Sequence, residues 1–278
     1  MIDFDNFEEY DDPLLYDQEN GQHKSEIPFL LKWAAKQKGL IIDLACGTGR
    51  ATIPLAEKGF ELVGVDVHKG MLNEARRKST SLPIEWVEQD CTSLNLPLKS
   101  NLVYCVGHSF QHFLTNEAQN QLLASVNRHL HSGGVFISDT RFPNQEELLQ
   151  PCTEEYWRTY VDRETSFPVD VYTVSEYDAL KQIQHYITIR KYKNNVGAII
   201  KEKRSNIRLR YTFPREMERL LTAHGFEIID VYKDWNETVI TNDSSEMVYV
   251  CKKRERQASK FPLKALIKSA MIEKTFKR

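Results

Sequence analysis

The sequence has few cysteines and no long apolar run. Its five cysteines are scattered and form no Cys-x-x-Cys pair, which argues against a disulfide framework or a zinc clamp. No apolar stretch is long enough to span a membrane. No cluster of His, Cys and Asp has the spacing of a metal site, so we expect no metal. The acidic start of the chain does not resemble a signal peptide, and with the scattered cysteines it predicts a cytoplasmic protein.

Positive and negative charges nearly cancel in the whole chain, but they are distributed unevenly along it. The 278 residues are 41% hydrophobic and 27% charged, which is typical of a folded protein with a sizeable core. The net charge is −2, yet residues 252–278 alone carry ten Lys or Arg against two Glu. Such a tail could bind RNA or a membrane, but it equally suits a solvated tail or one lying on an acidic body. We take the second interpretation for the basic tail, residues 254–278.

Short apolar runs alternate with helical stretches over residues 39–142. We expect strands at 40–44, 62–65, 84–87, 102–106 and 135–138. Near-continuous apolar strands alternating with helices are typical of a parallel sheet covered on both faces. The prediction is an α/β fold with an open, doubly wound, mostly parallel sheet. Its ligand site should lie at the carboxyl ends of the strands.

The flanking regions have other patterns. Residues 1–38 predict a loose acidic and aromatic arm and a lead-in helix that begins near Ile27. Residues 143–212 alternate polar and apolar residues at period two, which predicts an antiparallel hairpin insertion with a turn at 194–197. Residues 213–253 predict a helix ending before Gly225 and two strands that complete the sheet.

A glycine-containing turn follows the first expected strand, with Asp43 ahead of Gly47 and Gly49. Glycines allow backbone N–H groups to approach a ligand closely. Asp66 and Asp90 end the next two strands, where carboxylates can accept ribose hydroxyls and the adenine amine. Asp43 could help to hold a ligand ammonium. This combination describes adenosine joined to an amino acid.

Two other nucleotide-binding patterns fit less well. A nicotinamide dehydrogenase shares the turn and the later acid, but it expects a third glycine where this chain has Thr52. A P-loop requires Gly-Lys-Ser or Gly-Lys-Thr, and neither occurs. Phosphate recognition is therefore not favoured.

With these motifs the chain resembles the class I S-adenosylmethionine-dependent methyltransferases, most closely over 40–142, the expected cofactor-binding core. The resemblance implies S-adenosyl-L-methionine as cofactor and S-adenosyl-L-homocysteine as product. Ala45 stands where the family usually has its first glycine, and an alanine fits there if its φ stays negative. The resemblance implies that the cofactor contacts Tyr16, Asp43, Ala45, Gly47, Thr48, Asp66, Val67, Met71, Asp90, Cys91, Val106 and Gln111.

The acceptor side is expected after the fourth and fifth strands. His108 and His112 could take a proton from the acceptor or orient it, and Arg141 could bind a carboxylate or phosphate. The alternatives are a capping or packing role for the histidines and a surface ion pair for Arg141. Tyr16, with Tyr10, could cover the cofactor or attach the arm to the core.

We therefore expect methyl transfer to an N or O atom of a small-molecule acceptor by in-line attack. The hairpin insertion would cap the acceptor pocket, or its aromatic strands could pair two subunits in a homodimer. The alternatives are an RNA methyltransferase and a non-catalytic, cofactor-binding regulatory protein. Nucleic acid is not favoured as a partner, because no RNA-binding module and no Asn-Pro-Pro-Tyr type motif occurs.

Overall fold

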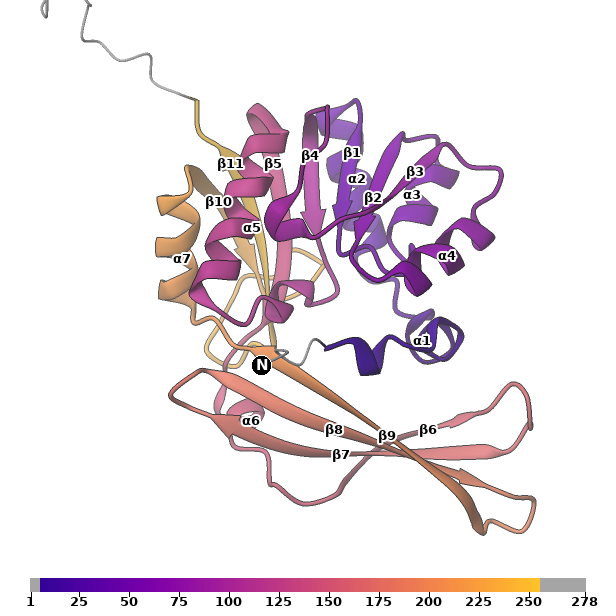
Figure 1. The fold of residues 1–278 in the computed structure, drawn as a ribbon. Coiled ribbons are helices and arrows are strands. Elements are labelled where there is room, and N and C mark those ends of the chain that lie inside the picture. The colour runs from indigo at the N-terminus through magenta and orange to yellow at the C-terminus, as the bar shows by residue number, and fades with distance from the viewer. Residues whose placement is uncertain (1–5, 256–278) are drawn as a thin grey trace, which may run out of the picture.

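Two β-sheets dominate the computed structural model, which describes residues 6–255 (Figure 1). The first has the strand order β10-β11-β5-β4-β1-β2-β3, and the second has the order β6-β7-β8-β9. The second sheet lies below the carboxyl ends of the parallel strands in Figure 1. The remainder of the basic tail, residues 256–278, lies outside the described residues.

The main sheet is parallel in its centre. β1 pairs in parallel with β2 and β4, β2 with β3, and β4 with β5, whereas β10 and β11 are antiparallel. The predicted doubly wound, mostly parallel α/β fold is confirmed. The strands are β1 Ile41–Leu44, β2 Leu62–Asp66, β3 Ile84–Glu88, β4 Ser100–Cys105, β5 Leu130–Arg141, β10 Phe226–Tyr232 and β11 Glu246–Lys253.

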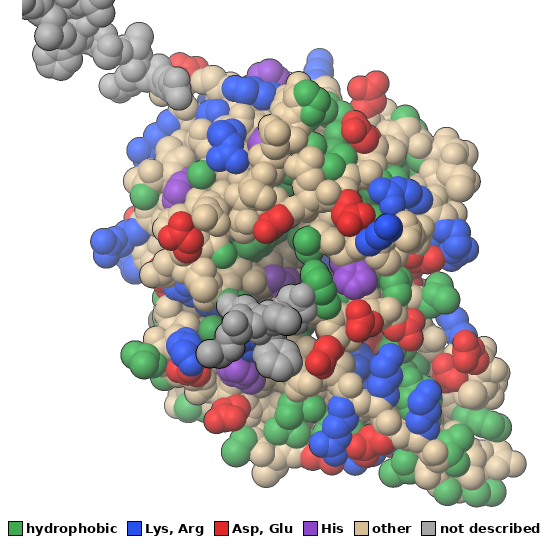
Figure 2. Space-filling model, in the orientation of Figure 1, with side chains coloured by type: hydrophobic (Ala, Val, Ile, Leu, Met, Phe, Trp, Pro, Cys, Tyr) green, Lys and Arg blue, Asp and Glu red, His purple; other side chains and the backbone are tan. Residues whose placement is uncertain are grey.

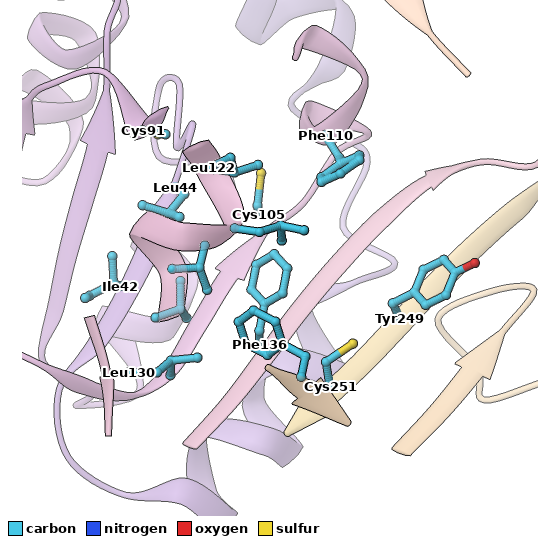
Figure 3. Close-up of a cluster of buried hydrophobic side chains, with 14 of the residues drawn as sticks. Ile42, Leu44, Cys91, Cys105, Phe110, Leu122, Leu130, Phe136, Tyr249 and Cys251 are labelled. Carbon is cyan, nitrogen blue, oxygen red and sulfur yellow. The ribbon is translucent and has the colours of Figure 1, made fainter. Parts of the chain in front are cut away.

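Helices bury both faces of this sheet, because apolar side chains of its central strands point to both sides. On one face, Ile42, Leu44 and Phe136 pack against side chains of α5 and α7 (Figure 3). On the other face, Ile41 and Tyr104 pack against α2 and α3. Burial on both faces explains why the strands lack a period-two pattern. The helices are α2 Ile27–Gln37, α3 Thr52–Glu57, α4 Lys69–Lys78, α5 Asn116–His129 and α7 Pro214–Ala223.

The insertion forms a sheet of its own. β7 Pro168–Asp178, β8 Ile183–Lys193 and β9 Ile199–Arg210 are the strands that the alternation predicts. Asn194 organises the turn between β8 and β9 by accepting bonds from the N–H groups of Val196 and Ala198. The sequence did not predict the fourth strand, β6 Glu155–Val161, because its residues are largely exposed and lack the alternation. A short helix, α6 Gln145–Leu148, precedes it.

The prediction of a loose N-terminal arm is wrong for the described part of the arm. A 3-10 helix, η1 Asn6–Glu9, precedes α1 Pro13–Asn20, which Asp12 caps and Pro13 begins. The arm is attached to the second sheet by Arg190, whose buried guanidinium binds Glu9 and Glu19 at 2.8 Å. Among residues 6–255, no helix is long and apolar enough to cross a membrane.

Candidate active site

The glycine turn after β1 is tightly wound, with several residues in the left-handed region. The φ angles are 55° at Ala45, 56° at Gly47 and 81° at Gly49. The expectation of a negative φ at Ala45 is therefore wrong, and this alanine adopts a conformation that usually requires glycine. Gly49 is needed for a second reason, because a Cβ there would stand 2.7 Å from the ring of Trp86.

Asp66 connects this turn to the end of β2. Its Oδ2 accepts a bond from the N–H of Gly47 at 2.8 Å, and its Oδ1 accepts one from the N–H of His68 at 2.8 Å. Burial raises the pKa of Asp66, and these two bonds oppose the rise. Each carboxylate oxygen has a further lone pair, so the side chain can still accept ribose hydroxyls.

The residues expected around adenine lie after β2 and β3. Val67 is 51% exposed, whereas Met71 is buried with its terminal methyl next to Gly47. Asp90 is exposed and caps a short 3-10 helix, η2 Cys91–Ser93, by accepting a bond from the N–H of Thr92. Cys91 lies beneath the surface, and burial raises the pKa of its thiol to about 12.

Asp43 and Thr48 lie deeper. Asp43 is 2% exposed and accepts a bond from the hydroxyl of Thr52 at 2.5 Å. Burial raises the pKa of Asp43 to about 7, although the hydrogen bond from Thr52 favours its charged form. Thr48 is also buried, and its hydroxyl donates to Asp17 of α1 at 2.5 Å, so the arm packs directly on the glycine turn.

These residues fit the expected cofactor. The turn leaves backbone free of side chains at Gly47 and Gly49, and three carboxylates lie at or near the carboxyl ends of three adjacent parallel strands. An exposed apolar side chain, Val67, stands between two of them. The hydrogen-bonding groups of the site therefore match those of an adenosine joined to an amino acid. Val106 and Gln111 are buried behind this surface, and Gln111 donates to the carbonyl of Arg210.

A cavity of about 620 Å³ lies beside the turn, between the main sheet and the second sheet. Figure 2 shows a hollow between these two parts on the face in view. The cavity's lining brings together residues from the arm, the main sheet, the loop after β4 and the second sheet. They include Tyr10, Tyr16, Arg50, Gly107, His108, His112, Asp139, Arg141, Glu147, Tyr186 and Glu246.

The two histidines have different surroundings in this cavity. His112 ends η3 Ser109–His112, and both of its ring nitrogens are bonded: Nε2 to the Tyr10 hydroxyl at 3.0 Å and Nδ1 to Asn6 at 2.8 Å. Burial lowers its pKa to about 4. His108 has a φ of 59°, and its backbone N–H donates to Asp139 at 3.0 Å. Burial also lowers the pKa of His108.

Arg141 lies at the end of β5, on the acceptor side of the cavity. It donates to the Tyr186 hydroxyl at 3.1 Å and lies 3.5 Å from Glu147. The ion pair that the sequence allowed as an alternative is therefore present, but its members line the cavity. Tyr186 comes from the second sheet, so this contact also connects the two sheets.

Sequence reasoning did not identify Glu246, Glu147 or Arg50 as site residues. Glu246 begins β11, and its register partner is Arg141 at the end of β5. An antiparallel strand begins where its parallel neighbours end, so the first residue of β11 reaches the ligand-binding edge. That argument needs the antiparallel direction of β11, which the sequence pattern did not predict.

Comparisons with known proteins agree with this geometry. Residues 41–134 match the family model described as a methyltransferase domain. The chain is 27% identical to the putative methyltransferase YqeM of Bacillus subtilis (strain 168), over 80% of this chain and 88% of that protein. It is also 27% identical to a glycine/sarcosine N-methyltransferase of Halorhodospira halochloris, over 84% and 83% of the two chains.

The fold agrees as well. A crystal structure of an S-adenosylmethionine-dependent methyltransferase from Clostridium acetobutylicum ATCC 824 superposes with a TM-score of 0.72 and 22% identity, over 87% of this chain and 97% of that one. The matched region, residues 41–134, contains the glycine turn and the three carboxylates at the strand ends. Residues 41–134 are thus a methyltransferase domain, and the chain is similar in sequence and in fold to S-adenosylmethionine-dependent methyltransferases.

Proposed function

We propose that this methyltransferase transfers its methyl group to a nitrogen atom of a small molecule that binds in the 620 Å³ cavity. The observation that carries the proposal is the lining of this cavity from several sides. The arm lines one side of it through Tyr10 and Tyr16, and the second sheet lines another through Tyr186. A cavity of this size suits a drug-sized or smaller acceptor.

Two observations count against a polymeric acceptor. The arm is attached to the second sheet through Arg190, so chain lines the cavity on two sides. On the face in view in Figure 2, Lys and Arg are intermixed with Asp and Glu and form no continuous basic surface. An RNA-binding face would be expected to have such a surface.

The side chains of the cavity support nitrogen rather than oxygen as the attacking atom. An alcohol needs a strong base before it can attack, whereas a free amine already has a nucleophilic lone pair. His112 is a weak base, because burial lowers its pKa to about 4 and both ring nitrogens are bonded. The similarity to a glycine/sarcosine N-methyltransferase agrees with an amine acceptor.

In this proposal the cofactor supplies a methyl group already activated on a sulfonium. Asp66 and Asp90 hold the adenosine, Asp43 lies under the turn, and His108, His112 and Arg141 line the acceptor side. With the cofactor bound, an amine held on this side could take the methyl group as its bond to sulfur breaks, leaving S-adenosylhomocysteine, and the nitrogen would release one proton to water. Positioning is the main contribution of the protein.

The test is methyl transfer from labelled S-adenosylmethionine to matched acceptors of equal size that differ in one group. The panel contains amino acids, amino sugars, and their hydroxyl counterparts. We expect product only with the amines. Transfer to hydroxyl compounds but not to amines would contradict the nitrogen assignment. Transfer to RNA but to no small molecule would contradict the proposal as a whole.

A further inference from the structure

We infer that His108, Asp139 and Glu246 form a binding site for a divalent metal ion on the wall of the cavity. The three come from separate segments: the loop after β4, the end of β5 and the start of β11. One ligand atom from each lies within 4.8 Å of the others. All three residues line the 620 Å³ cavity, so the ion would face the acceptor.

The distances are those of ligands around an ion rather than of hydrogen-bond partners. His108 Nε2 lies 3.4 Å from Asp139 Oδ2 and 3.3 Å from Glu246 Oε1. Both exceed the usual range of about 2.7–3.2 Å for an N–H···O bond. An ion about 2.1 Å from each ligand atom would separate these atoms by about 3.0–3.4 Å at octahedral or tetrahedral angles.

The cluster also has buried polar atoms that the described residues leave without a hydrogen-bond partner. Within residues 6–255, Asp139 Oδ1 and His108 Nε2 are both buried and unbonded. Asp139 is only 1% exposed, and Glu246 lies beside it. Two carboxylates next to a neutral imidazole need a cation or a shared proton to be stable away from water.

Surrounding groups hold the three side chains in place. The backbone N–H of His108 donates to Asp139 at 3.0 Å, and Trp235, which lines the same cavity, favours the charged form of Glu246. Such bonds orient ligands before an ion binds. His108 keeps a φ of 59°, a strained conformation that is typical of functional positions. Arg141 would repel a cation only weakly, because Glu147 lies 3.5 Å from it.

One imidazole nitrogen and two carboxylate oxygens suit a first-row transition ion such as Mn²⁺ or Zn²⁺ better than Mg²⁺. Three protein ligands leave open positions that face the cavity. An oxygen of the acceptor, from a hydroxyl or carboxylate, would occupy one of them and place the neighbouring amine for attack. This last role rests on the proposed function, whereas the metal site itself does not.

The experiment uses the full-length, tag-free chain after treatment with EDTA. Mn²⁺ is titrated while the electron paramagnetic resonance signal of the free ion is recorded, and Zn²⁺ is titrated by calorimetry. Asp139→Asn, Glu246→Gln and His108→Asn each remove one ligand, and asparagine tolerates the positive φ of position 108. Glu9→Gln is the matched control, since Glu9 lines the same cavity outside the cluster and its partner Arg190 keeps a second carboxylate, Glu19.

We expect one saturable site in the wild type. Each ligand variant should weaken it at least about tenfold, and the control should change it less than about twofold. S-adenosylhomocysteine affinity and thermal unfolding, measured in parallel, report whether each variant is folded. No saturable binding up to about 1 mM metal, or equal binding by all variants, would overturn the inference. Full methylation in EDTA, with only the KM for the amine raised in the ligand variants, would overturn the role of the ion in placing the acceptor, because the cluster would then hold an ammonium.

Failure of the metal site and failure of the proposed function give different results. If the chain binds metal at one saturable site but methylates the hydroxyl acceptors, only the nitrogen assignment is contradicted. Amine methylation without any metal binding would contradict the metal site alone. The two readouts are independent, because metal titration needs neither cofactor nor acceptor.

Discussion

Asp66→Asn should weaken cofactor binding and loosen the glycine turn at the same time. The two oxygens of Asp66 each accept a backbone N–H at 2.8 Å, one from Gly47 and one from His68. An amide keeps one oxygen and turns the other position into a donor, which leaves one N–H without a partner. A hydrogen bond to a charged group contributes about 1.5–3 kcal/mol. We expect the free energy of unfolding to fall by about that amount in a urea titration.

The affinity for S-adenosylhomocysteine should fall by about 2 kcal/mol, or roughly thirtyfold, if Asp66 also accepts the ribose hydroxyls. Calorimetric titration measures this loss. Glu88→Gln is the control, because Glu88 is the exposed register partner of Asp66 on β3. A 2′-deoxy analogue separates the two effects: it should bind the wild type more weakly but lose little further affinity in Asp66→Asn. If the affinity lost with the 2′-deoxy analogue and the affinity lost in Asp66→Asn simply add, Asp66 does not contact the ribose.

Three other substitutions probe the same region. Ala45→Gly should raise the free energy of unfolding by about 0.5–1 kcal/mol, because glycine adopts a φ of 55° without strain, and an unchanged urea midpoint would contradict this. Gly64→Ala should lower it by about 1–3 kcal/mol, since a Cβ would stand 2.4 Å from the Trp86 ring, and the loss should shrink in a Trp86→Leu background. Burial raises the pKa of Asp43 from 3.8 to about 7, so its stabilising contribution is complete below pH 4 and is lost as the pH rises through 7. Relative to wild type, Asp43→Asn should therefore gain on the order of 2–3 kcal/mol between pH 5 and pH 8, and parallel pH profiles would argue against the shift.

The fold could be predicted where burial leaves a pattern in the sequence. β1 and β2 are mostly apolar because helices cover both faces, and β7 to β9 alternate because residues on their two faces differ in exposure. β6 could not be predicted, since most of its residues are exposed and its pairing depends on β7. The arm was misjudged for a related reason. Its position depends on Arg190, a residue far away in the sequence.

The candidate site divides in the same way. The glycine turn, Asp66 and Asp90 could be expected as a group, because each follows a strand of one parallel sheet and order along the chain becomes order along the edge. The cluster of His108, Asp139 and Glu246 has no such local signal. Glu246 reaches Asp139 only because β11 runs antiparallel to β5, so that the beginning of one strand meets the end of the other. Spacing rules for metal ligands compare residues close in sequence, and they therefore miss a site whose members are brought together by strand direction.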